Sequence, residues 1–257
     1  MYLHIKAPFA AFRPFQSGSF RSTTLIPSPS TIYGLLLNLA GIEQRTATDE
    51  AITKIKPKDE LPQMEIAIAQ VKPSDTAILS QQLHSYPVGN SGKELAKKTY
   101  GAKYWISPVR RQILIDLELI IGVKAEADFC DRIIKGLNGQ LDEPRYGLPF
   151  AGDNNFLIDE INILNKPKLA RWYSQKHANN ESHPKWYGQI DNDSPPSHDK
   201  CRLTTWIDRA NNTKTKTKIF GIESNADSKA KTKMSDFEPS NYLLEPPEDR
   251  NIWISLP

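Results

Sequence analysis

Cysteines and long apolar runs are scarce in this sequence, and their scarcity excludes several classes of protein. The two cysteines, Cys130 and Cys201, stand far apart, so neither a disulfide framework nor a metal-binding cysteine pair is present. No apolar run reaches the ~18 residues that a membrane-spanning helix needs. Residues Met1 to Pro8 lack the basic start and apolar block of a signal peptide. We therefore expect a cytoplasmic protein without membrane contact, metal or cofactor.

Motifs of catalysis are also lacking. The sequence contains no glycine-rich P-loop, no nucleophile elbow and no carboxylate cluster of the metal-nuclease type. A metal-independent ribonuclease would need a histidine or tyrosine base and a cation beside it. Of the five histidines, His84 alone enters a basic segment with a tyrosine, Tyr86, close by. Binding is favoured over catalysis, and a ribonuclease that uses His84 with Tyr86 or Tyr100 is the alternative.

Regular patterns of apolar residues are concentrated in the first 165 residues. Strands are predicted at Tyr2–Ala7, Met64–Val71, Gln112–Gly122 and Asn155–Leu164. In the third of these, the odd-numbered residues from Ile113 to Ile121 should share one face, with Asp116 and Glu118 on the other. A helix is predicted at Ala125–Leu137, with Phe129, Ile133 and Leu137 on one side, and Asn138-Gly139 should form a turn.

The strongest helix signal follows Ser28. Ser28 is a good N-cap, Pro29 fits the first helical position, and Gly41 can end the helix in the left-handed conformation. Ile32, Leu35, Leu36 and Leu39 form one buried stripe. Gly34 inside the helix costs about 1 kcal/mol relative to alanine, so a close approach by the sheet or by a ligand is expected there.

The order of these elements predicts the fold class. Strand, helix, strand, long insertion, strand, helix, loop and strand fit an α+β, ferredoxin-like βαββαβ domain over residues 1–165, an antiparallel sheet with two helices on one face. Residues 166–257 are predicted to form a smaller, loop-rich β region. Its short strands are expected at Cys201–Ile207, Lys216–Ile222 and Asn251–Leu256, and Asn179–Lys200 should be a mobile loop.

Positive charge is concentrated in the insertion, although the whole chain carries a net charge of only +3. Between Lys93 and Arg111, six basic residues face one acidic residue, Glu94, a local net charge of +5. Aromatic residues lie among these charges. Lysine and arginine neutralise phosphates, and aromatic rings stack on bases, so this composition is typical of a binder of single-stranded nucleic acid. A solvated hairpin with its rings packed beneath it fits the composition equally well.

A second candidate site lies where the chain enters the first helix. Helix N-termini carry free amide donors and a partial positive charge, so they favour phosphate. Arg13, Arg21 and Ser28 could complete such a site. An ordinary helix cap flanked by two surface arginines is the alternative.

Three segments together resemble a known family. Phe12-Arg13-Pro14-Phe15, Arg21-Ser22-Thr23-Thr24 and the run from Pro27 to Leu36 are similar to the N-terminal signature of the fifth Cas protein family. Its members are RAMP-superfamily subunits of type I CRISPR Cascade complexes. The segment Arg145-Tyr146-Gly147-Leu148-Pro149-Phe150-Ala151-Gly152-Asp153 resembles the loop that follows the second helix in that family, and the combination most resembles the myxobacterial-type, type I-B branch. The resemblance is dense over residues 1–42 and 110–165.

The resemblance implies a function. Members of the family bind the 5′ handle of the CRISPR RNA (crRNA) and contact both the large subunit, which reads the DNA motif beside the protospacer, and the first backbone subunit. A long β-hairpin thumb crosses the RNA, and residues 79–111 lie in the position of that thumb. The resemblance thus implies a non-catalytic RNA-binding subunit, with a structural scaffold protein and a crRNA-processing ribonuclease as alternatives. The implied RNA-binding residues are Arg13, Arg21, Ser28, Ser30, Lys97, Lys98, Tyr100, Lys103, Tyr104, Trp105, Arg110, Arg111, Tyr146, Gly147 and Gly152.

Overall fold

The computed structural model describes residues 1–14, 20–46, 54–85, 105–166, 169–175, 200–208, 214–222 and 252–256. Two α-helices and one 3₁₀ turn accompany the strands in this part of the chain. In chain order, the elements are β1 (Tyr2–Ala10), β2 (Phe20–Arg21), α1 (Pro29–Leu39), β3 (Arg45–Thr46), β4 (Lys54–Ile55), η1 (Lys58–Glu60), β5 (Met64–Gln70), β6 (Asp75–Ser85), β7 (Trp105–Ala125), α2 (Ala127–Leu137), β8 (Glu160–Leu164), β9 (Arg171–Gln175), β10 (Lys200–Trp206), β11 (Lys216–Ile222) and β12 (Ile254–Leu256).

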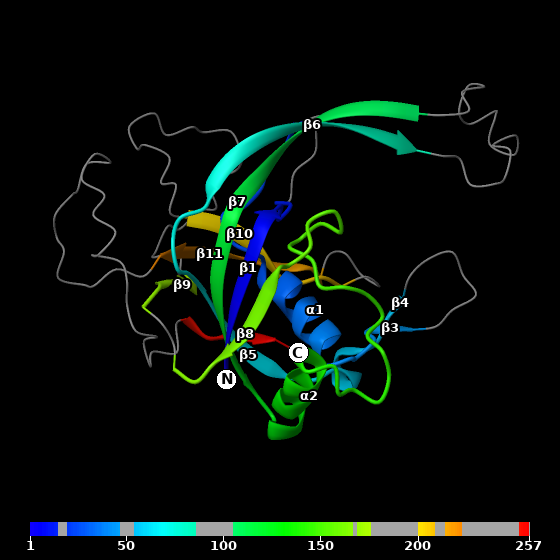
Figure 1. Cartoon of the computed structure of the whole chain (residues 1–257), viewed down its shortest axis with the longest axis vertical. Helices are drawn as coiled ribbons and strands as arrows, with labels where there is room; N and C mark the ends of the chain where they lie inside the picture. The colour runs from blue at the N-terminus through cyan, green and yellow to red at the C-terminus, as the bar shows by residue number, and fades with distance from the viewer. Residues whose placement is uncertain are drawn as a thin grey trace, which may run out of the picture.

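One large, mainly antiparallel sheet dominates the structure, and both helices lie behind the sheet face that Figure 1 turns to the viewer. The strand order is β10-β11-β9-β5-β7-β1-β8, with β12 pairing with β5 and with β2 and β6 pairing with β7. Strands β1, β5, β7 and β8 are the four that the sequence predicts for its first 165 residues. The main core lies between these strands and the helices, and Leu3, Ile66, Leu119 and Leu36 belong to it.

Helix α1 begins and ends at the predicted residues. The Ser28 Oγ accepts a hydrogen bond from the Thr31 amide at 3.2 Å, and Pro29 is the first helical residue. Gly41 adopts a φ of 68°, and the amide of Ile42 donates to the Leu37 carbonyl at 2.8 Å, which closes the helix. The predicted helix at Ala125–Leu137 and the turn at Asn138-Gly139 are also confirmed, with α2 burying Phe129 and Ile133.

Strand β7 is longer than the predicted Gln112–Gly122, because it serves two parts of the molecule. Its second half pairs with β5 and β1 in the sheet. Its first half pairs with β6, from Asp75 opposite Ile115 to Ser85 opposite Trp105, and forms a hairpin that rises above the sheet in Figure 1. We call residues 75–85 and 105–115 the arm. The pattern of apolar residues did not predict β6, because its described residues have no buried face.

The two parts of β7 meet at Asp116, where the alternation of side chains shifts. Asp116 has a φ of 56°, a left-handed conformation that aspartate tolerates better than most residues. On the sheet side, Leu117, Leu119 and Ile121 enter the main core, whereas on the arm side Leu114 does so. The prediction that Ile113 and Ile115 share the face of Leu117 was therefore wrong.

The partner strand β1 shifts at the same level. Its register with β7 pairs Ala7 with Leu117 and Phe9 with Ile115, so Pro8 lies opposite Asp116. Proline has no amide hydrogen to donate to the ladder, and an irregular position accommodates it. Strand β1 consequently continues to Ala10, and the prediction that it ends before Pro8 was wrong.

Two other elements differ from the prediction. Strand β8 starts at Glu160 and not at Asn155, because the Asp153 carboxylate accepts the Asn155 amide at 3.0 Å and holds a turn there. Strand β9 was not predicted, since Arg171, Trp172 and Tyr173 are all buried and leave no alternation in the sequence.

The three short strands expected after residue 166 are present as β10, β11 and β12, and together with β9 they belong to the same sheet. The expected mobile loop at Asn179–Lys200 lies outside the described residues, apart from Lys200 in β10.

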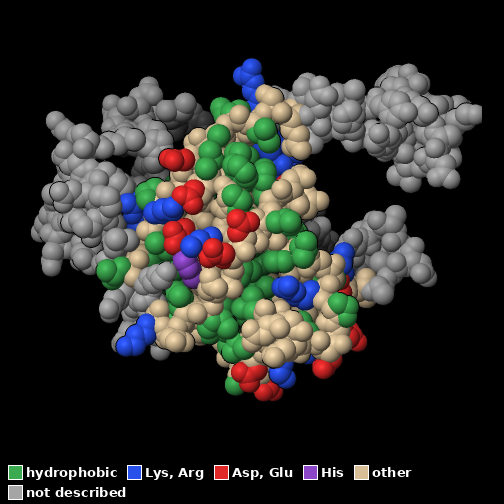
Figure 2. Space-filling model, viewed as in Figure 1, with side chains coloured by type: hydrophobic (Ala, Val, Ile, Leu, Met, Phe, Trp, Pro, Cys, Tyr) green, Lys and Arg blue, Asp and Glu red, His purple; other side chains and the backbone are tan. Residues whose placement is uncertain are grey.

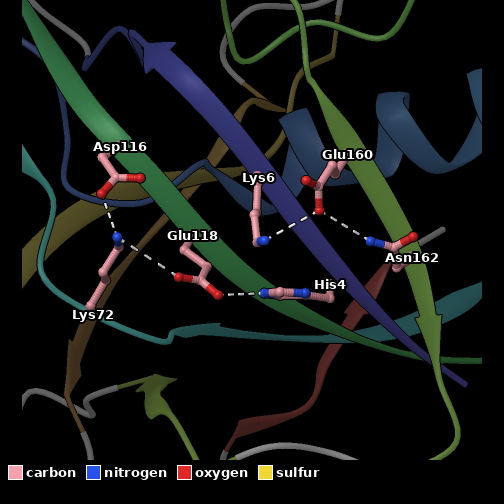
Figure 3. Close-up of polar contacts among 7 residues, drawn as sticks. All are labelled: His4, Lys6, Lys72, Asp116, Glu118, Glu160 and Asn162. Carbon is pink, nitrogen blue, oxygen red and sulfur yellow. Dashed lines mark hydrogen bonds and ion pairs between the residues drawn. The ribbon is translucent and has the colours of Figure 1, made fainter.

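The face of the sheet away from the helices carries both apolar and charged side chains (Figure 2). A second apolar cluster there contains Ala67, Ala69, Ile120, Trp172 and Ile252. Beside it, a network of polar side chains crosses three strands (Figure 3): His4 contacts Glu118 at 2.6 Å, Lys72 pairs with Asp116, and Lys6 pairs with Glu160 at 3.2 Å. Acids and bases partner one another in this network, so their charges are balanced within it.

Candidate nucleic-acid interface

A hollow of about 550 Å³ opens between α1 and residues 146–153, which follow α2 in the chain. We call these residues the 146–153 loop. The volume is within the range of small-ligand sites. Four residues that the sequence proposes for RNA contact line this hollow: Ser30 from α1, and Tyr146, Gly147 and Gly152 from the loop. Residues more than one hundred positions apart in the sequence are thereby brought to one place.

The α1 side of the hollow is formed by a stripe in which the sequence analysis singled out Ser30 and Gly34 but missed Asn38. Ser30, Gly34 and Asn38 recur every four residues, so they share a helix face. Asn38 is only 6% exposed, and its Nδ2 donates to the Gly147 carbonyl at 3.2 Å, which ties the loop to the helix. A Cβ at Gly34 would meet only the Gln44 side chain at 3.6 Å, so the sheet does not crowd this glycine. The spacing of three small or polar residues beside the apolar stripe was the available signal.

Tyr146 forms the rim of the hollow. Its ring is 45% exposed, and the Arg45 guanidinium lies over it at 5.1 Å from the centroid. Arg45 is itself held by Glu43 through two hydrogen bonds of 2.9 and 2.5 Å, and the pKa of Glu43 is lowered chiefly by the hydrogen bond from Arg45. Partial burial raises the pKa of the Tyr146 hydroxyl. At neutral pH, the rim therefore offers an uncharged phenol and a cation whose charge its acidic partner balances.

Gly152 occupies the tightest position of the loop. Its φ is 80°, and a Cβ there would lie 2.4 Å from the Ala11 carbonyl oxygen and 2.5 Å from the Phe12 ring. Neighbouring bonds fix the same region, since the Ala11 amide donates to the Ala151 carbonyl at 3.1 Å. Glycine is required here by close packing against the end of β1 and by its backbone conformation.

Three of the proposed arginines meet where β2 pairs with β7, and we call this part of the molecule the base of the arm. Strand β2 runs parallel to β7, with Phe20 opposite Arg110 and Arg21 opposite Arg111. Arg110 is exposed and Arg21 is half-buried. Arg111 is only 7% exposed, and its Nη2 lies 2.6 Å from the Asp153 carboxylate. Arg110 can thus meet a phosphate directly, while Arg111 already has an anionic partner.

Ser28 and Arg13 have different surroundings. The Ser28 hydroxyl lies 2.9 Å from that of Ser30 and 2.8 Å from that of Thr31, so the cap satisfies its own hydroxyls. Arg13 is exposed, just after the bridge between Phe12 and Thr24. Neither Arg13 nor Ser28 lines the hollow.

Several proposed residues are not among those whose side chains the structure describes. Lys97, Lys98, Tyr100, Lys103 and Tyr104 lie outside the described residues, as does Tyr86. Trp105 and His84 are described only by their backbone, as residues of β7 and β6. RNA contact by these residues stays a prediction.

Within the described part of the chain, no group of three or more His, Cys, Asp or Glu side chains could hold a metal ion. Neither α1 nor α2 is long and apolar enough to cross a membrane.

Comparison with known proteins gives a match in structure and none in sequence. No protein-family model matches the sequence, and no curated protein matches it. A chain of a solved "CRISPR RNA-guided surveillance complex" superposes with a TM-score of 0.52 at 11% identity, covering 86% of this chain and 88% of that one.

Two further solved structures resemble the chain less. A "Cas protein" gives a TM-score of 0.32 at 15% identity over 60% of this chain and 56% of its own, and a "CRISPR-associated Protein" gives 0.34 at 9% over 64% and 66%. With TM-scores under 0.5, these two add nothing to the assignment of the fold. From the first comparison, the chain shares its fold with a chain of a CRISPR RNA-guided surveillance complex.

Proposed function

We propose that this chain is a non-catalytic RNA-binding subunit of a type I CRISPR Cascade complex, and that it caps the 5′ handle of the crRNA. The observation that carries the proposal is the hollow between α1 and the 146–153 loop, which brings together four residues that the family resemblance implied for RNA contact. The fold shared with a chain of a surveillance complex supports the same assignment.

The chemistry of the hollow suits a short piece of single-stranded RNA. Gly147 is open, since a Cβ there would meet nothing within 4 Å, so a sugar or phosphate can approach the backbone closely. The exposed rings of Tyr146 and Phe150 offer stacking faces for bases. At the base of the arm, Arg110 lies on one side of the sheet and Arg21, paired with Arg111, on the other, so each can supply positive charge to phosphates on its own side. In this arrangement, the RNA runs from the hollow toward the arm.

The finer assignments follow from the same proposal. Strands β5, β7, β1 and β8 are adjacent in that order, with α1 between β1 and β5 and α2 between β7 and β8 in the chain, as a ferredoxin-like RAMP domain requires. We assign the arm as the thumb and the chain to the fifth Cas family, type I-B branch. Its partners would be the large subunit, the first backbone subunit and target DNA near the protospacer-adjacent motif, in the cytoplasm. Both nuclease-recruiting and transposition-linked complexes use such a subunit.

The test is binding of a fluorescent repeat-derived 5′-handle RNA across a range of salt concentrations. Gly34→Leu fills the hollow, and because leucine favours a helix more than glycine does, α1 should remain folded. We expect binding to weaken by about tenfold, the scale of an overpacked site. Arg110→Gln should weaken binding. It should also make the fall of log affinity with log salt shallower, reducing the magnitude of the slope by about 0.7, because one phosphate contact is lost.

Lys124→Gln is the matched control, because Lys124 lies on the same strand at the opposite end, over Trp253. We expect its affinity and slope to equal those of the wild type. The proposal is wrong if the wild type does not bind the handle in preference to a scrambled RNA, or if Gly34→Leu binds as well as the wild type.

The absence of catalysis needs its own experiment. Precursor repeat RNA is incubated with the chain in EDTA, and we expect it to stay intact. Specific cutting that His84→Ala abolishes would replace the proposal with a metal-independent ribonuclease.

A further inference from the structure

Arg111 and Arg110 are neighbours in sequence with opposite surroundings. Alternate residues of a strand point to opposite sides, and Arg110 is exposed while Arg111 is 7% exposed. The Arg111 guanidinium donates to Asp153 Oδ2 at 2.6 Å and lies over the Phe156 ring at 5.4 Å from the centroid. Its charge is compensated within the protein, so it is poorly placed to neutralise a phosphate.

Asp153, the acidic partner of this ion pair, lies in a hydrogen-bonded turn. Asp153 Oδ1 accepts hydrogen bonds from the Asn155 amide at 3.0 Å and from the Asn155 side chain at 2.8 Å. The Ala151 amide donates to the Phe156 carbonyl at 2.7 Å across the turn. The ion pair therefore joins the arm to a hydrogen-bonded turn and not to a single free side chain.

This turn continues directly into the wall of the hollow. Gly152 lines the hollow and precedes Asp153, and Asn38 holds the other end of the loop through Gly147. Beside the backbone bond from Ala11 to Ala151, side chains hold the loop from α1, through Asn38, and from the arm, through Arg111. Of these, the Arg111–Asp153 pair is the side-chain link between the arm and the hollow among the described residues.

We propose that Arg111 is a positioning residue that fixes the 146–153 loop relative to the base of the arm, so that one RNA strand can contact both. The inference rests on the proposed function for its RNA readout. It differs from the expectation that Arg111 touches RNA, because a positioning residue contributes preorganisation and no counterion release.

The salt dependence of binding separates the two roles. For Arg111→Gln, we expect affinity for the 5′-handle RNA to fall by about tenfold through loss of preorganisation, with the salt slope equal to that of the wild type. Arg110→Gln, the matched neighbour, should lower the slope by about 0.7. Arg111→Lys keeps the charge but loses the planar guanidinium that lies over the Phe156 ring, so it should behave like Arg111→Gln.

A second variant guards against loss of folding. Arg111→Gln alone leaves Asp153 without its cation, whereas Arg111→Gln combined with Asp153→Asn leaves neither charge unpaired. If the Arg111–Asp153 ion pair is what positions the loop, this double variant should bind RNA no more weakly than Arg111→Gln alone. Circular dichroism and an unfolding curve establish that each variant is folded at the temperature of the binding assay.

Hydrogen exchange of the free protein supplies a readout that needs no RNA. In the double variant, we expect amides of residues 150–157 to exchange at least about tenfold faster, because the local opening free energy falls, while α2 amides stay unchanged. Unchanged exchange at 150–157 overturns the positioning role, as does a fall of the salt slope in Arg111→Gln. A folded variant with wild-type affinity also overturns it. If the wild type binds no handle RNA, the proposed function fails, and the exchange experiment still decides the link.

Discussion

Gly152→Ala tests whether the wall of the hollow is as tightly built as the structure indicates. Alanine in the left-handed conformation that Gly152 adopts, at a φ of 80°, costs about 1–2 kcal/mol. Its Cβ would also lie 2.4 Å from the Ala11 carbonyl oxygen, and backbone cannot move aside as a flexible side chain can. Overpacking of this kind costs a further ~1–3 kcal/mol. The expected loss in the free energy of unfolding is therefore about 2–5 kcal/mol.

Two other glycines separate these contributions. Gly139 has a similar φ of 69°, but a Cβ there would meet nothing within 4 Å, so Gly139→Ala carries the conformational cost alone, about 1–2 kcal/mol. Gly147 has neither a positive φ nor a neighbour within 4 Å, so Gly147→Ala should change stability by less than about 1 kcal/mol.

The assay is urea unfolding followed by tryptophan fluorescence and circular dichroism. With a denaturant slope of about 2–3 kcal/mol per molar, Gly152→Ala should lower the midpoint by about 1–2 M. It should also weaken RNA binding, because the backbone has to move where Gly152 lines the hollow. The reasoning is refuted if Gly152→Ala destabilises the protein no more than Gly139→Ala does.

Three further predictions concern single residues near the site. Ser28→Ala removes the side chain that caps α1 and should cost about 1 kcal/mol in a thermal or urea unfolding experiment; Ser28→Asp, another good cap, should restore most of it. Asp116→Val should destabilise by about 1–2 kcal/mol at its φ of 56°, whereas Asp116→Gly should be nearly neutral, and equal effects of the two would contradict the backbone explanation. Partial burial opposes ionisation of Asp153, but hydrogen bonds from Asn155 and Arg111 more than offset it and lower the pKa of its carboxyl. A lowered pKa gives stability that is present above the unfolded value of about 3.9 and is lost as the pH falls below it. The stability gap between wild type and Asp153→Asn should therefore narrow below about pH 4, and a gap that stays constant down to acid would contradict the assignment.

Elements with a local signal could be predicted from the sequence. Helix α1 carries its start in Ser28 and Pro29, its buried stripe in every turn and its end in Gly41, so all three features match the structure. Strand β7 was recognised in its second half, where Leu117, Leu119 and Ile121 alternate toward the main core. Each of these signals depends on residues close in sequence, and tertiary contacts did not override them.

Features that depend on distant contacts could not be predicted in the same way. Strand β9 has Trp172 and Tyr173 buried on opposite sides, so nothing in its pattern distinguishes it from other buried segments. The role of Arg111 depends on Asp153, forty-two positions later, and in sequence it looks like one more cation of a basic segment. Asn38 was overlooked because the apolar stripe of α1 accounts for the helix, although Asn38 shares a face with Ser30 and Gly34.

The shift at Asp116 connects the fold to the site. Without it, the odd-numbered residues of β7 would keep one orientation throughout, and Arg111 would point to the side of Leu117, toward the main core. With it, Leu114 takes the core side, and Arg111 turns to the side where Asp153 and Phe156 lie. One backbone position that aspartate or glycine adopts with little strain therefore decides whether the buried arginine of the arm can reach the wall of the hollow. For this reason, a substitution that straightened β7 at Asp116 should harm RNA binding more than it harms folding.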